Sequence, residues 1–366
     1  MKKINLLFII SFLLVISLPL IFMDKKSRIS ERENRTLATF PHFISFNNGN
    51  IDIENIRSIP RALDNYTNDR FGFRNTYISL ANAILSASND INGNVIIGKD
   101  GWLFYSRNDD GNNINDFFKM NLFSDIEIGR FMNSINDRIE WCNRNNIKFI
   151  FLIAPNKHNV YPEYYPFERP EGITRTEQIM TAMTDNIKAD IIYPINVLIQ
   201  NKTEEMPLYF ETDTHWNMIG AYYVFEILLD RMKWLFPETH FPEINFVTDI
   251  SYDSSGDIVP MSGFSSYGKR TIPKMYPVNG WVSYFQYVKN DGPNGIIAKN
   301  NDLSLPKAII FRDSFFDQLE PFTSTIFSSA EYHSRWFTEA DKNYILENKP
   351  DVIIWEMVER SMSRIP

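Results

Sequence analysis

The sequence predicts an α/β protein with three layers, in which helices cover both faces of a mainly parallel β-sheet. Four short apolar runs carry this prediction, because a continuous apolar run is typical of a strand buried on both faces. The runs lie at residues 148–154, 191–198, 307–311 and 351–355. Segments with helical spacing separate them, at residues 173–189, 217–235 and 340–347. Such alternation is the pattern of a three-layer α/β domain.

The composition fits a globular protein and excludes several other classes. Of the 366 residues, 44% are apolar and 22% are charged, which excludes disorder over the whole chain. The formal net charge of −8 leaves no basic footprint for nucleic acid. A mean hydropathy of −0.27 excludes a polytopic membrane protein. The chain has no P-loop and no Gly-x-Gly-x-x-Gly pattern, so we expect no cofactor.

The first 23 residues predict a membrane anchor. Residues 4–23 are almost wholly apolar, and a helix of this length spans about 30 Å of hydrocarbon. The segment ends in Leu20-Ile21-Phe22-Met23-Asp24, which lacks the small residues of a cleavage site and favours an uncleaved signal-anchor over a cleaved signal peptide. We expect a single span in the inner (cytoplasmic) membrane, with the rest of the chain facing the periplasm or the cell exterior.

The single cysteine fits an exported protein that needs no disulfide. Cys142 has no second cysteine to pair with. It lies on the apolar stripe of a helix predicted over residues 124–145, which a capping box of Ser124 and Glu127 opens. We therefore interpret Cys142 as a small core residue.

The remaining chain is interpreted as a linker over residues 24–57 and one domain over residues 58–366. Residues 59–88 are expected to be mainly helical, and Gly98-Lys99-Asp100-Gly101 predicts a hairpin turn within residues 94–105. Residues 237–300 depart from the strand–helix alternation and are rich in Pro, Gly, Ser and aromatic residues. They predict an insertion near the active face.

A serine follows the apolar run at 307–311. In open parallel sheets, sites form at the carboxyl ends of the strands, so Ser314 is the candidate nucleophile. Its backbone N–H lies at a predicted helix N-terminus, where it can help to hold an oxyanion. The alternative is that Asp313 or Ser314 is an ordinary helix N-cap.

A histidine with a nearby carboxylate supplies the candidate base. His215 can accept the proton of a serine hydroxyl, and Asp213 lies two residues earlier, within reach of the imidazole Nδ1–H. The alternative makes Asp213 a helix cap and His215 a loop residue without a role.

Two further residues follow the run at 148–154. Lys157 and His158 can bind an anionic or hydroxylated substrate, or can simply be solvated. A metal site of Asp213, His215 and His158 is the less favoured alternative, because no His-x-His, His-Glu-x-x-His or carboxylate cluster supports it.

The motifs together resemble the alginate O-acetyltransferase AlgJ/AlgX-type family of SGNH-hydrolase-like proteins, which is related to the DHHW proteins. The resemblance rests on motifs that occur in the same order over most of the chain. They are Glu33-Asn34-Arg35 with Pro41, Asp69 to Arg74, Gly98 to Tyr105, Pro155-Asn156-Lys157-His158 with Tyr161-Pro162, Thr212 to Trp216, Asp313-Ser314-Phe315, and Glu356 with Glu359-Arg360.

The resemblance implies a Ser-His-Asp acyl-transfer centre of Ser314, His215 and Asp213, in a circularly permuted order, within an SGNH-like domain. It also implies a polysaccharide acceptor and an acetyl donor, with a membrane-bound O-acyltransferase as a partner that delivers acetyl groups. Oxyanion donors are expected from Ser314, with Asn156 and Arg312 as additions. Substrate contacts are expected from Lys157, His158, Tyr161 and Trp216, and from the aromatic residues Tyr267, Trp281 and Tyr284 of the insertion.

Two departures from the family keep other functions open. The serine motif is Arg312-Asp313-Ser314 in place of Gly-Asp-Ser, and the Gly-x-Asn block that supplies oxyanion donors is missing. An esterase that removes acetyl groups would use the same three residues. A polysaccharide-binding or scaffold protein with a degenerate site is the alternative from another class.

Overall fold

The computed structural model describes most of the chain. The described residues are 17–19, 21–30, 35–41, 46–47, 50–51, 53–73, 94–107, 110–111, 113–188, 190–262, 267–289 and 295–365. Internal contacts divide the chain into two compact units. The smaller unit comprises residues 1–92 and 259–265, and the larger one residues 93–258 and 266–366.

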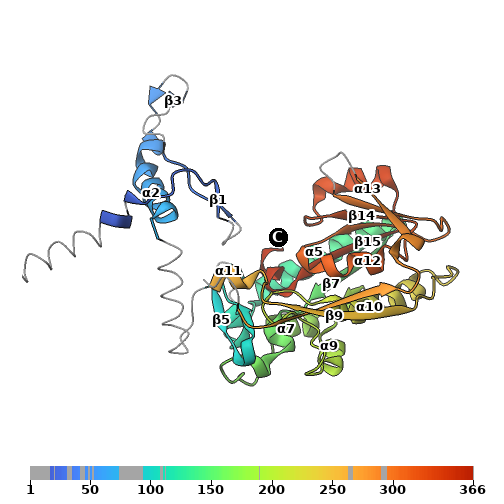
Figure 1. The fold of residues 1–366 in the computed structure, drawn as a ribbon. Coiled ribbons are helices and arrows are strands. Elements are labelled where there is room, and N and C mark those ends of the chain that lie inside the picture. Colours follow the sequence, from blue (N-terminus) through green and yellow to red (C-terminus); the bar gives the residue numbers. More distant parts are fainter. Residues whose placement is uncertain are drawn as a thin grey trace, which may run out of the picture. The chain divides into compact units, whose positions relative to one another are not determined.

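A seven-stranded sheet forms the centre of the larger unit, in the order β11-β12-β14-β13-β15-β7-β8 (Figure 1). Its strands are β7 (Lys148–Ala154), β8 (Ile191–Ile192), β11 (Phe285–Lys289), β12 (Ile296–Asn300), β13 (Lys307–Phe311), β14 (Ser329–His333) and β15 (Val352–Val358). The five strands from β14 to β8 run parallel, and β11 and β12 pair antiparallel at one edge. The prediction of a mainly parallel sheet is confirmed.

Helices cover both faces of this sheet, as predicted. Side chains alternate along β7, so that Ile150 and Leu152 lie in one core and Phe149 and Phe151 in the other. Helix α10 (Met218–Leu235) packs into the first core, and α5 (Asp125–Arg144) into the second. The capping box that opens α5 is present, and Cys142 is fully buried on this helix. Burial raises the pKa of its thiol to about 12.

The remaining regular segments of the larger unit are shorter. They are β5 (Val95–Ile97), η1 (Lys99–Gly101), β6 (Leu103–Tyr105), α4 (Asn113–Phe117), α6 (Lys157–Val160), η2 (Pro162–Tyr164), α7 (Arg175–Ala182), α8 (Asp185–Lys188), η4 (Ser314–Gln318), α12 (Glu320–Thr323), η5 (Glu339–Asp341), α13 (Lys342–Asn348) and η6 (Glu359–Arg364). Strands β5 and β6 form the predicted hairpin.

The strand predicted at residues 191–198 is mostly wrong. Strand β8 ends at Ile192, and helix α9 (Ile195–Asn201) follows directly after Pro194. Proline fixes a φ angle that suits the start of a helix and has no N–H to pair in a strand. Leu198 is fully buried on this helix, so its apolar character reflects helix packing.

The insertion predicted over residues 237–300 is shorter than expected. Strands β9 (Phe246–Asp253) and β10 (Arg270–Pro277) form an antiparallel ribbon, and η3 (Trp281–Ser283) follows it. Strands β11 and β12, however, belong to the central sheet. The sequence pattern missed them because edge strands carry polar residues such as Gln286 and Lys299 and lack a continuous apolar run. Trp281 and Tyr284 pack against the core, and Tyr267 is half-buried.

The smaller unit contains regular structure where a linker was expected. It has two strand pairs, β1 (Ile29–Ser30) with β2 (Arg35–Thr36) and β3 (Phe46–Asn47) with β4 (Asn50–Ile51), followed by α2 (Ile53–Arg70). Helix α11 (Ile258–Ser262) also belongs to this unit, except for its first residue. The guanidinium of Arg70 donates to the carbonyls of Asp24, Ser27 and Ala38. The end of α2 therefore holds the preceding segment in place.

Two predictions fall largely outside the described residues. The helix expected over residues 59–88 is described as far as Arg70, and residues 74–88 lie outside. The anchor expected over residues 1–23 is described only at 17–19 and 21–23. Among the parts of the chain that the structure describes, no helix has both the length and the apolar character needed to cross a membrane.

Candidate active site

Three neighbouring parallel strands bring polar side chains to one edge of the sheet. Strand β13 is followed by Ser314, β7 by Asn156 and β15 by Arg360. Because β13, β15 and β7 are adjacent and parallel, their carboxyl ends meet at this edge. The sequence predicted this location for Ser314 and Asn156.

Asp313 is the N-cap of η4, and this leaves the Ser314 side chain available for another contact. The Asp313 Oδ1 accepts the N–H of Phe315 at 2.8 Å, and its Oδ2 accepts the N–H of Val358 at 2.8 Å. Ser314 is exposed, and its Oγ lies 2.8 Å from Nε2 of His215. The capping interpretation therefore holds for Asp313, whereas Ser314 faces the histidine.

Asp213 and His215 form a hydrogen-bonded pair in the loop before α10. The Oδ1 of Asp213 lies 2.6 Å from His215 Nδ1 and also accepts the His215 N–H at 3.2 Å. The Oδ2 of Asp213 accepts the N–H of Asp257 at 3.1 Å and a guanidinium N–H of Arg270 at 3.3 Å. Asp213, His215 and Ser314 thus form one continuous hydrogen-bonded series.

The electrostatics of the pair keep Asp213 ionised and favour a proton on His215. Burial lowers the pKa of His215, but the hydrogen bond with Asp213 and the charges of Asp257 and Asp213 more than offset it and raise the pKa. Burial raises the pKa of Asp213, and its hydrogen bond and charge interaction with His215 lower it by more. An ionised Asp213 fixes the tautomer of the imidazole that leaves Nε2 facing Ser314.

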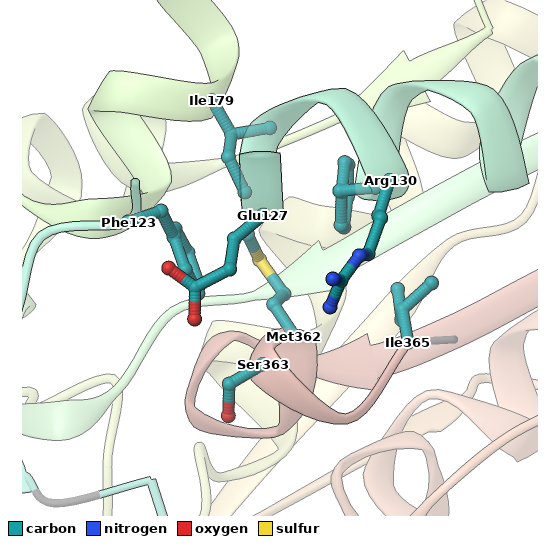
Figure 2. Close-up of a pocket in the computed structure, with 8 residues that line it drawn as sticks. Phe123, Glu127, Arg130, Ile179, Met362, Ser363 and Ile365 are labelled. Carbon is teal, nitrogen blue, oxygen red and sulfur yellow. The ribbon is translucent and has the colours of Figure 1, made fainter. Parts of the chain in front are cut away.

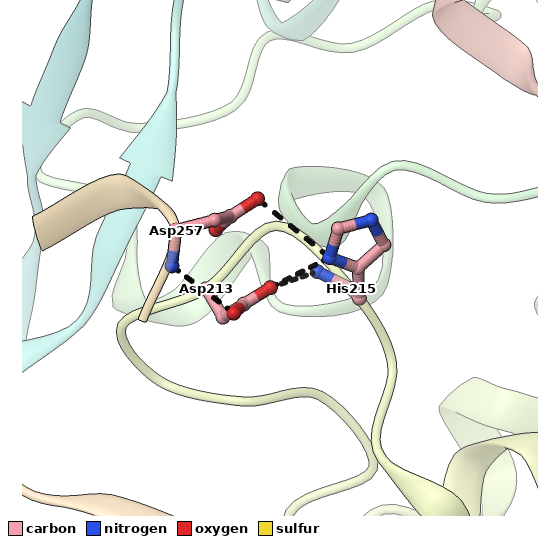
Figure 3. Close-up of side chains that lie close together, drawn as sticks. All are labelled: Asp213, His215 and Asp257. Carbon is pink, nitrogen blue, oxygen red and sulfur yellow. Dashed lines mark hydrogen bonds and ion pairs between the residues drawn. The ribbon is translucent and has the colours of Figure 1, made fainter. Parts of the chain in front are cut away.

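The structure adds Asp257, which the sequence did not indicate (Figure 3). Its Oδ2 lies 3.6 Å from His215 Nδ1 and accepts the Thr214 hydroxyl at 2.6 Å. The preceding residue, Gly256, has a φ of +145°, and a Cβ there would lie 2.1 Å from the Thr212 carbonyl oxygen. Only glycine allows the two segments to approach so closely.

The side chains expected to contact substrate are buried instead. Lys157, His158, Tyr161 and Trp216 are at most 4% exposed. The Tyr161 hydroxyl accepts the N–H of Leu208, and His158 Nε2 lies 3.0 Å from an Asp116 oxygen. The structure therefore buries these four side chains, and their contact with a substrate stays a prediction.

Lys157 supports the loop that carries Asp213. Its ammonium donates to three backbone carbonyls, those of Phe210, Glu211 and Asp213, at 3.1, 3.1 and 2.7 Å. Burial lowers the pKa of Lys157 to about 7. A lysine buried in this way fixes the backbone beside His215, because each hydrogen bond from a charged group is worth more than a neutral one.

Arg312 is directed away from the role of oxyanion donor. Its guanidinium donates to the carboxylates of Asp317 and Glu320. Asn156 remains a candidate. It is 2% exposed, its N–H donates to Glu359 and its Oδ1 accepts a guanidinium N–H of Arg360 at 3.3 Å. Its amide Nδ2 is buried without a partner, which is costly unless a ligand accepts from it.

A small groove lies beside this orphan amide. It is lined by Phe104, Tyr105, Asn113, Asn156, Lys157, His158, Thr214 and Arg360. The Cζ of Arg360 lies over the rings of Tyr105 and Phe315, at 5.1 and 5.4 Å from their centroids. Since Phe315 follows Ser314, Arg360 links the serine turn to Asn156. The sequence placed Arg360 in a matched motif but assigned it no role.

A second pocket shares no residue with this groove (Figure 2). Helix α5 lines one side of it with Glu127 and Arg130, and Met362 and Ile365 line it from the C-terminal segment. None of the candidate site residues lines it.

The structure changes the set of residues that could bind a metal. His158 is paired with Asp116, so it does not join Asp213 and His215. Among the residues that the structure describes, Asp213, His215 and Asp257 are the group whose possible ligand atoms lie within 4.8 Å of one another. Hydrogen bonds from Thr214, Arg270 and the Asp257 backbone already occupy their carboxylate oxygens.

The fold and the site define an α/β protein with a hydrogen-bonded Ser-His-Asp series at the carboxyl edge of a parallel sheet. A family model described as the SGNH hydrolase-like domain of acetyltransferase AlgX matches residues 95–283, just over half of the chain. The chain belongs to this acetyltransferase family.

The chain is similar to one known protein in sequence and to another in fold. A Pseudomonas aeruginosa protein described as "Probable alginate O-acetylase AlgJ" is 25% identical over 176 residues, which cover 45% of this chain and 40% of that protein. The match therefore spans well under half of that relative. Bacillus cereus PatB1 has a similar fold, with a TM-score of 0.56 and 17% identity over 74% of this chain and 97% of that one. The structure of B. cereus PatB1 with a sulfonyl adduct has a TM-score of 0.55 and 18% identity, over 74% of this chain and 97% of that one.

Proposed function

We propose that this protein is a polysaccharide O-acetyltransferase that works through an acyl-enzyme intermediate on Ser314. The observation that carries the proposal is the series from Asp213 through His215 to Ser314, with distances of 2.6 and 2.8 Å. Both contacts lie within the reach that proton transfer requires. Membership of the acetyltransferase family agrees with acyl transfer as the reaction.

In the first half-reaction, His215 Nε2 takes the proton of Ser314 while the hydroxyl oxygen attacks the carbonyl carbon of an acetyl donor. The carbonyl oxygen becomes an oxyanion, the bond to the leaving group breaks, and His215 returns the proton to that group. In the second half-reaction, His215 deprotonates a sugar hydroxyl, which attacks the carbonyl carbon of the acetyl-serine ester. The bond between this carbon and the Ser314 oxygen breaks, and His215 returns the proton to Ser314. Asp213 orients the imidazole and stabilises its cation.

The proposed oxyanion donors are the Ser314 N–H and the Nδ2 amide of Asn156. Asn156 is the better supported of the two donors. Its buried amide Nδ2 has no partner among the described residues, and its Oδ1 accepts a hydrogen bond from Arg360. A donor that is held in place before the reaction needs no reorganisation when the oxyanion forms. Arg312 is not included, because the two terminal nitrogens of its guanidinium donate to Asp317 and Glu320.

The acceptor, the donor and the location are part of the proposal. The name of the P. aeruginosa relative points to alginate or a similar acidic glycan. We propose that a membrane-bound O-acyltransferase supplies the acetyl group. The apolar segment at residues 4–23 would hold the protein at the outer face of the cytoplasmic membrane.

An esterase and a scaffold protein are the competing functions. Water in place of a sugar hydroxyl would make the same three residues an acetyl esterase. A degenerate scaffold would bind glycan without an acyl-enzyme, and it gives no reason for the 2.8 Å contact between His215 and Ser314.

NMR of a glycan incubated with the protein separates these functions. The full-length protein is mixed with p-nitrophenyl acetate and unacetylated alginate oligosaccharides, and Ser314→Ala serves as the matched variant. New O-acetyl signals on the sugar with wild type alone support the transferase. Free acetate without acetylated sugar identifies an esterase. Acetylated sugar formed equally by Ser314→Ala would overturn the proposal.

A further inference from the structure

A second carboxylate lies beside the imidazole of His215 (Figure 3). Nδ1 of His215 is 2.6 Å from Oδ1 of Asp213 and 3.6 Å from Oδ2 of Asp257. The first contact is a hydrogen bond, and the second is an ion-pair distance. The two carboxylates come from segments that are 44 residues apart in the chain.

Hydrogen bonds fix the Asp257 carboxylate in this position. Its Oδ1 accepts the Thr214 N–H at 2.8 Å, and its Oδ2 accepts the Thr214 hydroxyl at 2.6 Å. The same hydroxyl oxygen is 3.2 Å from His215 Nδ1. The N–H of Asp257 donates to Oδ2 of Asp213. Asp257 therefore contacts all three residues of the loop from Asp213 to His215.

Basic side chains surround the pair of Asp213 and His215. Three cations lie close to the site: the Arg270 guanidinium 3.3 Å from Asp213, the Lys157 ammonium 2.7 Å from the Asp213 carbonyl oxygen, and Arg360 on the ring of Phe315. Arg270 is also paired with Asp253 on β9. Without Asp257, the Asp213 carboxylate would be the single anion in contact with His215 among the described residues.

We propose that Asp257 is a positioning residue for the base. It holds His215 through Thr214 and stabilises the imidazolium that forms when Ser314 loses its proton. The proposal rests on the function proposed above for His215. In agreement with this geometry, burial lowers the pKa of His215, and the hydrogen bond with Asp213 and the charges of Asp257 and Asp213 raise it.

The test measures the His215 imidazole by NMR titration in the full-length protein, with Asp257→Asn as the variant. Removal of the negative charge should lower the pKa of His215 by about half a unit or more. The acid limb of acyl-enzyme formation should move to lower pH by the same amount, and the rate on the plateau should fall about tenfold. A residue that merely supports the fold would not move the titration.

Controls separate this effect from misfolding. Asp249→Asn removes an exposed carboxylate from β9 that bonds to the Tyr276 hydroxyl, and it should leave the titration of His215 unchanged. Thr214→Val removes the hydroxyl between Asp257 and His215, and it provides the test if Asp257→Asn does not fold. Asp257→Glu keeps the negative charge, so the pKa of His215 in this variant should lie between its values in Asp257→Asn and in wild type.

An unchanged pKa of His215 in folded Asp257→Asn, or in Thr214→Val if Asp257→Asn does not fold, would overturn the proposal. Because the NMR titration needs no substrate, it decides this point even if wild type forms no acetyl-serine. If wild type forms no acetyl-serine, that result refutes the function proposed for Ser314 and leaves the role of Asp257 to the titration.

Discussion

The imidazole Nε2 of His215 lies 2.8 Å from the hydroxyl Oγ of Ser314, although 99 residues separate the two along the chain. Two features bring them together. Ser314 is placed by the end of β13 and the Asp313 cap, and His215 is placed by the loop that Lys157 holds. The ring of Phe315 packs 4.8 Å from the imidazole, centroid to centroid. The contact is therefore built from rigid neighbours on both sides.

The pH dependence of acyl-enzyme formation should reveal the raised pKa of His215. Burial lowers this pKa, but Asp213 and Asp257 raise it above the ordinary value of 6.5. Only the neutral imidazole accepts the serine proton, so the rate should fall as the pH drops through the raised value. Stopped-flow release of p-nitrophenol, followed at its isosbestic wavelength, measures this limb. A midpoint below 6.5 would contradict the described electrostatics.

Replacement of Asn156 should slow acyl transfer with little effect on folding. Asn156→Asp keeps an oxygen for the Arg360 contact and removes the orphan amide donor. Loss of one oxyanion donor costs about 10²–10³ in kcat. Steady-state kinetics with p-nitrophenyl acetate measure the effect, and Asn143→Asp, an exposed position on α5, is the control. A kcat equal to that of wild type would remove Asn156 from the site.

Lys157→Met should destabilise the protein. The substitution removes the ammonium donor from three carbonyl oxygens, of which that of Glu211 keeps the N–H of Leu103 as a partner. We expect the free energy of unfolding to fall by about 2–4 kcal/mol, since unsatisfied buried groups cost about 1–3 kcal/mol each and partial relaxation offsets part of the sum. Urea denaturation measures this change.

The matched control for Lys157 is Lys99→Met. Lys99 donates to one carbonyl, that of Glu163, at the surface. Surface substitutions usually change stability by less than about 0.5 kcal/mol. Equal losses in the two variants would show that the buried ammonium does not hold the loop.

The stability of Glu356→Gln relative to wild type should increase as the pH rises. Glu356 is fully buried, its Oε2 accepts the Asp313 N–H at 2.9 Å, and burial and the Asp313 charge raise its pKa well above 4.5. Above pH 4.5 the unfolded chain releases this proton while the folded protein keeps it, so Glu356 lowers the stability of the wild type as pH rises. Glutamine has no proton to lose.

Urea midpoints near pH 4.5 and near pH 7.5 test this prediction. The midpoint of Glu356→Gln relative to wild type should be higher at the second pH. Glu347→Gln, an exposed position on α13, should show no such change. The same offset of Glu356→Gln at both pH values would show that Glu356 titrates normally.

The sequence predicted the strands that carry the site and missed β11, β12 and β14. Strands β7, β13 and β15 are continuous apolar runs because both of their faces are buried. Strand β14 was missed because it contains Glu331 and His333, which are buried with an oxygen and a nitrogen 3.0 Å apart. A pattern of hydrophobicity does not anticipate such a pair.

The site residues show the same limit. Ser314, His215 and Asp213 were found because a strand end and an Asp-x-His triplet are local signals. Asp257 was not found, because it lies in a segment without sequence periodicity and comes close to His215 only when the chain folds. Lys157 was expected to contact substrate, and its burial against three carbonyls depends on long-range packing that its residue type does not reveal.

The intact mass of the full-length protein after brief exposure to p-nitrophenyl acetate tests the role of Ser314 most directly. We expect one added acetyl group, located on the peptide that contains Ser314 and absent from Ser314→Ala. His215→Gln should slow its formation by about 10³–10⁴-fold, whereas His240→Gln, an exposed histidine, should not. The same adduct in Ser314→Ala, or unchanged turnover in both Ser314→Ala and His215→Gln, would contradict the account.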